Sequence, residues 1–280
     1  MIRIVTDTSA DITVSQALEM NVELVPLYIN FDGASYYPLQ DETFNIFYKM
    51  LAEAKSLPTT SQPDPQSFLS IYEDAKQAGD DVVVITLSSK VSGTFQSANI
   101  ANEICGYDRV HIVDSLSAII GQRLLVEMAV RERAEGASAV EIAAKVREAS
   151  KHVVLAAGLD TLKYLRKGGR IPKSTEMLGT VIGIKPLVKL KDGALVMAGK
   201  ARGRLGAINA LLELIAQEKA MNPKDLIYFG YTKCDEQCKI LIEQATQKFN
   251  LLKTVCFPVG SVVGTHVGPG AFVISYLPAF

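Results

Sequence analysis

VVVITLSSKVSGTFQSANIAN, residues 82–102, is the stretch that best indicates the fold class. It divides into VVVITL at 82–87, SSKVSGT at 88–94 and FQSANIAN at 95–102. Six consecutive apolar or β-branched residues predict a buried strand of a parallel sheet, and the third segment has the composition of a helix. The hydroxyl-rich segment between them follows the carboxyl end of that strand, where open α/β sheets bind their ligands. It also leads into a helix N-terminus, which attracts anions through unpaired N–H groups and the helix dipole. Two interpretations remain open: an anion site, or a helix that Ser92 or Thr94 simply caps.

The composition predicts a compact soluble protein. The chain has 280 residues, 48% of them hydrophobic, and a net charge of −1, and this length suits two domains. The near-neutral charge argues against nucleic acid as a partner, because nucleic-acid binding needs a basic surface. No apolar run reaches about 18 residues, so we expect no membrane span. The first residues, MIRIV, lack the features of a signal peptide, and a cytoplasmic location is the expectation that follows.

Strand and helix patterns alternate through the first half of the chain. This alternation predicts a parallel, doubly wound sheet in residues 1–150. Beyond residue 150 the pattern changes, because apolar segments at 187–190 and 195–200 flank the hairpin signal Lys191-Asp192-Gly193. We therefore predict a two-domain α/β protein, in which residues 151–280 form an α+β domain with a mixed or antiparallel sheet.

Motifs for metals, nucleotides and common hydrolases are missing. Cys234 and Cys238 have i,i+4 spacing without a nearby histidine, so we expect reduced thiols rather than zinc. Asp7 and Asp11 follow the first strand, where carboxylates more often cap a helix than bind a metal. GGRIPKS at 168–174 lacks the glycine that precedes the lysine of a phosphate loop, and no G-x-G-x-x-G follows a predicted strand. We expect neither a metal nor a cofactor.

Three segments far apart in the sequence combine hydroxyl groups with glycines or a helix start. The first contains Thr60 and Ser61, the second is the loop at 88–94, and the third is GSVVGTHVGPG at 260–270, which we expect to be a loop. Glycines allow the backbone to approach a ligand closely. Neutral donors beside a helix N-terminus suit a single carboxylate better than a polyphosphate, because they suffice for one charge.

Five segments together closely resemble the DegV family, in order and over essentially the whole chain. They are TSQP at 60–63, SSKVSGT at 88–94, LDTL at 159–162 with GGR at 168–170, IKP at 184–186, and GTHVGPG at 264–270. Each motif is weak alone, but five in register are specific. Members of this family bind fatty acids, and some serve as the fatty-acid-binding subunit of bacterial fatty acid kinase. Asp64 departs from the family pattern, which often has serine there, but aspartate is an equally good cap.

The resemblance implies a lipid pocket between the two domains, with a long-chain fatty acid as the ligand. It implies that Arg170 lies near the head group or a partner, and that Arg202 docks an ATP-dependent fatty acid kinase subunit. The chain would then be a carrier, not an enzyme by itself. The residues expected at the carboxylate are Thr60, Ser61, Ser92, Gly93, Thr265 and His266.

Two other functions remain open from the sequence. Ser92, His266 and an aspartate such as Asp114 could form a hydrolase triad, although Ser92 lacks the nucleophile-elbow sequence. The same pocket would also serve a lipid-sensing regulatory protein without a kinase partner, and the sequence does not separate that protein from a carrier.

Overall fold

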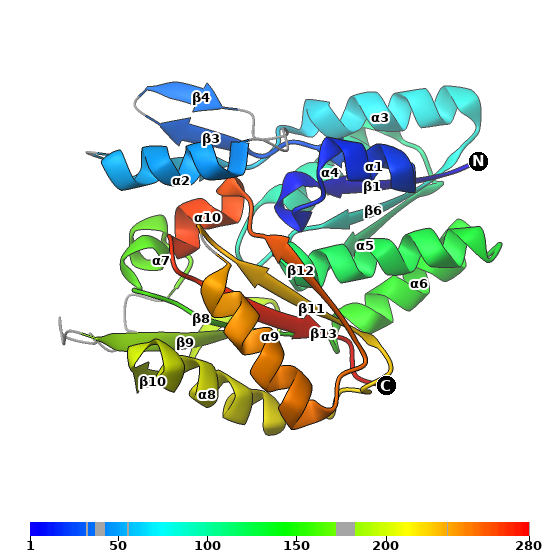
Figure 1. Ribbon diagram of the computed structural model, residues 1–280. Helices are drawn as coiled ribbons and strands as arrows, with labels where there is room; N and C mark the ends of the chain where they lie inside the picture. The colour runs from blue at the N-terminus through cyan, green and yellow to red at the C-terminus, as the bar shows by residue number, and fades with distance from the viewer. Residues whose placement is uncertain (32, 37–42, 55, 172–182, 234, 280) are drawn as a thin grey trace.

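The two larger sheets of the chain pack on either side of a long helix, α5 (Ile119–Ala134) (Figure 1). The computed structural model describes residues 1–280 except 32, 37–42, 55, 172–182, 234 and 280. The strands of the first sheet all precede residue 115, and those of the second all follow residue 153. The two-domain α/β prediction is confirmed, and the division at residue 150 remains our proposal for the boundary.

The first sheet is parallel and has the strand order β2-β1-β6-β7. Its inner strand β6 covers most of the apolar run at 82–87, and Val82 to Ile85 are completely buried. Val82 and Val84 pack toward α3 and α4, whereas Val83 and Ile85 pack toward α5 and α6. A strand covered on both faces has no polar alternation, which is why this one is continuously apolar. The strands are β1 (Ile2–Asp7), β2 (Val22–Val25), β6 (Asp81–Thr86) and β7 (Val110–Asp114).

Three helices of the first half, α1, α3 and α6, begin after residues whose side chains cap them. Asp64 precedes α3, its carboxylate accepts from the Ser67 amide at 2.9 Å, and Pro65 is the first helical residue. Ser138 and Glu141 form a capping box at the start of α6. The helices are η1 (Thr8–Ala10), α1 (Val14–Met20), α2 (Thr43–Glu53), α3 (Pro65–Ala78), α4 (Thr94–Cys105), α5, and α6 (Ala139–Ser150).

A small antiparallel sheet, in the order β4-β3-β5, was not predicted from the sequence. Its strands are β3 (Tyr28–Phe31), β4 (Ala34–Tyr36) and β5 (Thr59–Ser61). β2 and β3 lie in different sheets, although only Pro26 and Leu27 separate them along the chain. With α2, this small sheet packs on α10, so it lies beside the segment that contains His266.

The second sheet is mixed, with the order β10-β9-β8-β13-β11-β12, and only the β11–β12 pair is parallel. The hairpin predicted at Asp192-Gly193 joins β9 to β10. One face of the sheet packs against α8 and α9, and the other faces α5. Its strands are β8 (Val154–Gly158), β9 (Ile184–Lys191), β10 (Ala194–Arg202), β11 (Leu226–Tyr231), β12 (Lys253–Pro258) and β13 (Phe272–Tyr276). The helices here are α7 (Lys163–Gly168), α8 (Gly203–Ala216), α9 (Glu236–Phe249) and α10 (Ser261–Val267).

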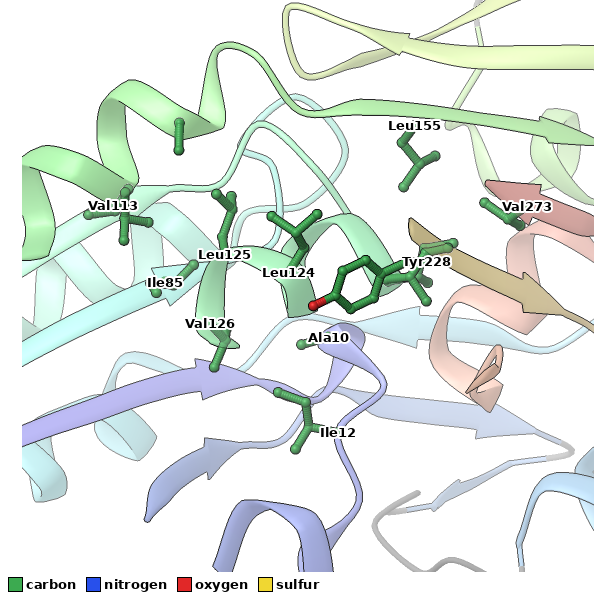
Figure 2. Packing of buried hydrophobic residues seen from close by; sticks show 14 of the residues in the cluster. Ala10, Ile12, Ile85, Val113, Leu124, Leu125, Val126, Leu155, Tyr228 and Val273 are labelled. Atoms are coloured by element: carbon green, nitrogen blue, oxygen red, sulfur yellow. The ribbon is translucent and has the colours of Figure 1, made fainter. Parts of the chain in front are cut away.

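Figure 2 shows how α5 joins the two sheets into one core. Leu124 and Leu125 of α5 lie between Ile85 of the first sheet and Leu155 of the second, and all four are at most 7% exposed. Each such side chain stabilises the fold by roughly 1.5–3 kcal/mol through burial. The relative position of the sheets is therefore fixed by apolar packing.

The expectation of a loop at 260–270 was wrong, because residues 261–267 form the helix α10. Its glycines serve close packing: a Cβ at Gly264 would lie 2.4 Å from the Tyr48 hydroxyl oxygen. Over the part of the chain that the structure describes, no helix has the length and apolar character needed to cross a bilayer.

Candidate functional site

An apolar cavity lies between the first sheet, α10 and the inner face of the second sheet. About 840 Å³ of space lies between its walls, part of which is open to solvent. Its walls come from both halves of the chain, including Leu87 and Ile119 from the first and Leu155 and Val188 from the second. The pocket implied between the domains is therefore present.

The floor of the cavity follows from strand register. Ala157 of β8 pairs with Val188 of β9 and with Val273 of β13, so these three side chains form one row across the sheet. Leu190 and Leu195, which pair across the β9–β10 hairpin, line the cavity two residues further along. The alternation of strand side chains turns these residues inward and leaves their neighbours to pack against α8 and α9.

Four polar side chains line the cavity among the described residues: Thr60, Ser92, Arg170 and His266. They come from four separate segments, yet close contacts connect them. Thr60 contacts His266, His266 packs against Gly168, and Arg170 binds the backbone on either side of this cluster. The polar groups therefore gather at one place in an otherwise apolar wall.

Thr60 and His266 form the central contact of this cluster. Thr60 Oγ1 of β5 lies 2.7 Å from His266 Nε2 of α10. The other ring nitrogen, Nδ1, is buried without a hydrogen-bond partner, and a Cβ on Gly168 would lie 2.3 Å from it. Glycine at 168 therefore allows α7 to pack directly against the imidazole.

Burial keeps the His266 imidazole neutral. Desolvation first, and the nearby positive charge of Arg170 second, lower the pKa of His266 to about 4. At neutral pH the ring therefore has one N–H donor and one acceptor nitrogen.

Arg170 connects two segments beside the cavity. Its Nε donates to the Val91 carbonyl at 3.1 Å, and its Nη1 donates to the Gly168 carbonyl at 2.5 Å. The guanidinium thus joins the 88–94 loop to the end of α7 and still lines the cavity. Arg170 is the charged residue among the described cavity-lining side chains.

The 88–94 loop presents Ser92 at the cavity wall. The Ser92 hydroxyl lies 2.9 Å from that of Thr94. A Cβ at Gly93 would lie 1.9 Å from the Gln62 carboxamide oxygen, so only glycine lets the TSQP segment approach this closely. Gln62 then donates to Ser97 of α4 at 3.0 Å. The segment at 60–63 and the loop at 88–94 therefore lie next to each other in the fold.

Three of the expected carboxylate residues do not line the cavity. Gly93 packs against Gln62, and the hydroxyls of Ser61 and Thr265 have other partners. Thr265 is buried and donates to the Ser261 carbonyl at 2.8 Å within α10, and Ser61 accepts from Asn30 at 2.6 Å. Neither lines the cavity. Arg202 is exposed at the end of β10, directly before α8, and it does not line the cavity.

The carboxylates of Asp7 and Asp11 are both buried. The Asp7 carboxylate accepts from the Leu87 amide at 2.7 Å and the Ser9 amide at 3.0 Å, so it joins the ends of β1 and β6. Burial raises the pKa of Asp11 to about 8. Within the described ranges no group of three potential metal-binding side chains occurs. Cys234, the other residue of the weighed cysteine pair, lies outside the described residues.

The hydrolase triad is not assembled. Asp114 accepts from the backbone amides of Ser89 and Leu116, while His266 bonds to Thr60 and leaves Nδ1 unpartnered. A triad needs a nucleophile on one ring nitrogen and a carboxylate on the other. These contacts match neither requirement.

Sequence reasoning missed the apolar wall near the start of α5. Ile119 lines the cavity with a φ of 46°, and Leu116 has a φ of 49°. Residues other than glycine rarely have this left-handed backbone conformation, and β-branched residues have it least often. Such backbone strain concentrates at binding sites. No sequence signal distinguishes these residues from ordinary core.

The fold and the cavity define the class of protein: a two-domain α/β protein with an internal apolar pocket whose wall contains a small group of polar side chains. The chain belongs to the DegV family, since the family model, described as uncharacterised proteins of that family, matches residues 1–279. A DegV domain-containing protein of Clostridium acetobutylicum is 33% identical over 279 residues, covering 100% of this chain and 99% of the relative. A protein named as a fatty acid-binding protein in Thermotoga maritima is 31% identical, covering 96% of this chain and 95% of the relative.

A solved structure agrees with the fold. The DegV family protein from Thermus thermophilus, whose structure is described as showing fatty acid binding, has a TM-score of 0.88 and 30% identity, covering 99% of each chain. The match extends over both sheets, so the two proteins share the arrangement of these sheets.

Proposed function

We propose that this protein binds a long-chain fatty acid in the cavity, with the carboxylate at the polar cluster and the acyl tail along the apolar floor. The observation that carries the proposal is the grouping of Thr60, Ser92, Arg170 and His266 at one place in an apolar pocket. A ligand with one polar end and a long apolar remainder matches this distribution. The names of the Thermotoga and Thermus relatives support the same ligand class.

The tail supplies most of the affinity. Burying one methylene is worth about 0.8 kcal/mol, so a tail of about 14 methylenes grosses roughly 11 kcal/mol before association costs. A hydrogen bond to a charged group adds about 1.5–3 kcal/mol. The walls therefore hold the ligand, and the polar cluster determines where its carboxylate lies.

The Thr60–His266 pair can orient a donor toward the carboxylate. If neutral His266 donates from Nε2 to Thr60 Oγ1, the Thr60 hydroxyl proton is available to the ligand. Ser92 supplies a second hydroxyl from the opposite segment, and Arg170 supplies the positive charge. Two neutral donors and one shared cation suffice for a single carboxylate.

We propose further that the protein presents the bound fatty acid to a separate ATP-dependent kinase, which forms the acyl phosphate. The sequence has no nucleotide motif of its own, so ATP would be bound by the partner. Arg202, with Lys200 and Arg204, forms an exposed basic surface at the β10–α8 junction. This is our proposed docking surface, and the chain would act as a carrier in the cytoplasm.

Mass spectrometry of lipid extracted from the purified protein tests the ligand class. We expect long-chain fatty acid in stoichiometric amounts, and extraction of another lipid class or of none would contradict the proposal. The kinase step is tested separately by acyl-phosphate formation. Arg202→Ala should lower it at least tenfold without changing fatty acid affinity, with Lys224→Ala as the control. Unchanged turnover would favour a lipid sensor without a kinase partner.

A further inference from the structure

Two cysteines of the second domain lie in contact on the side away from the cavity. Cys238 Sγ of α9 is 3.3 Å from Cys256 Sγ of β12. Cys238 is completely buried, and its Sγ lies 3.5 Å from the Gly230 carbonyl oxygen. Cys256 is half-buried on the edge strand of the sheet. Cys256 is therefore the more accessible residue of the pair, and Cys238 lies behind it in the core.

The surroundings divide the roles of the two thiols. The hydrogen bond from Cys238 stabilises a Cys256 thiolate and lowers the pKa of Cys256, helped more weakly by the charge of Lys239. The same contact, with burial, raises the pKa of Cys238. Asp235 opposes the Cys256 thiolate, but it is ion-paired with Lys239 at 2.6 Å. Cys256 is thus the more nucleophilic of the two.

We propose that Cys238 and Cys256 form a reversible intramolecular disulfide when hydrogen peroxide oxidises Cys256. The Cys256 thiolate attacks the peroxide, an S–O bond forms, the O–O bond breaks, and the leaving oxygen takes up a proton as water. Cys238 sulfur then attacks the Cys256 sulfenic acid, an S–S bond forms, the S–O bond breaks, and the Cys238 proton leaves with the second water. The two thiols supply two electrons, and the peroxide is reduced.

The geometry suits this bond and fixes its structural effect. A disulfide needs the sulfurs at about 2.05 Å, so they must approach by about 1.2 Å from their 3.3 Å separation. Cys238 and Cys256 are 18 residues apart, and the bond would tie α9 to the edge strand β12. That strand leads through Val259, a cavity wall, into α10 with His266. The oxidised form should therefore be the more rigid one on this side of the site.

Peptide mapping of peroxide-treated protein tests the inference without any bound ligand. Reduced, delipidated protein is treated with hydrogen peroxide, the remaining thiols are alkylated, and the digest is analysed by mass spectrometry. We expect a Cys238–Cys256 linked peptide, loss of two of the four thiols, a raised Tm, and reversal of all three by dithiothreitol. Cys234→Ser should leave the linkage intact, and Cys256→Ser should abolish both the linkage and the rise in Tm.

Other oxidation products would overturn the proposal. These are a linkage through Cys234, an intermolecular dimer, a Cys256 sulfinic acid without linkage, or no thiol loss. The wild-type peptide map decides between them even if a cysteine variant folds poorly. Its result is independent of the proposed fatty acid function, because a lipid-free protein is used.

Discussion

Replacing the hydroxyls of Thr60 and Ser92 should weaken the binding of a fatty acid but should leave the binding of its methyl ester unchanged. Ser92→Ala removes one donor, and Thr60→Val removes the other and leaves His266 Nε2 without its partner at 2.7 Å. A hydrogen bond to a charged group is worth about 1.5–3 kcal/mol, so each change should raise the Kd roughly 10–150-fold. Because both hydroxyls would bind one carboxylate, the losses in the double variant should not simply add.

Titration calorimetry with palmitate and methyl palmitate on delipidated protein measures this difference. Thr60→Ser keeps the hydroxyl and should keep most of the affinity, and Ser89→Ala alters an exposed hydroxyl of the same loop and should change nothing. The ester lacks the anionic head group, so the variants should bind it about as tightly as the wild type does. Undiminished palmitate affinity in the double variant would refute the head-group assignment, and equal losses for acid and ester would show a general disturbance of the pocket.

Two further predictions concern the imidazole and the cavity floor. Since the pKa of His266 is lowered to about 4, the unfolded chain takes up a proton between about pH 6.5 and 4 that the folded apo-protein does not. Its stability should therefore fall as the pH falls through this window, by up to about 3 kcal/mol. Urea denaturation of wild type and His266→Gln checks this, and an equal pH slope in both would contradict it. Ala157→Leu should fill the cavity floor and weaken palmitate binding by about 2 kcal/mol, roughly thirtyfold, for the methylenes it displaces. Its apo stability should hold, whereas a loss of about 1–3 kcal/mol with unchanged affinity would place Ala157 in ordinary core.

Much of the fold was predictable because local patterns agreed with it. The run at 82–87 is apolar on both faces because β6 is covered by helices on both faces, and periodicity detects that directly. Asp64-Pro65 and Asp192-Gly193 encode a helix start and a hairpin turn through their own backbone preferences. These signals need no knowledge of distant residues.

The errors arose where distant contacts override local preference. Glycine-rich 260–270 suggested a loop, but α10 is stabilised by packing: Tyr48 lies against Gly264 and donates to the Val259 carbonyl at 3.0 Å. Thr265 was expected near the ligand, yet one position along a helix turns a side chain by about 100°. That turn directs Thr265 into its own helix while His266 faces Thr60.

The sequence by itself determined the classes of structure and the residues worth testing. Thr60, Ser92, Arg170 and His266 could be selected from motifs, and all four line the cavity. The cavity itself was decided only by the tertiary structure. Its walls consist mainly of leucine, valine and alanine, the residue types that also form the core. The type of a residue does not tell whether its side chain contacts another side chain or empty space. That distinction depends on how α5, α10 and the second sheet meet, which no local segment of the chain contains.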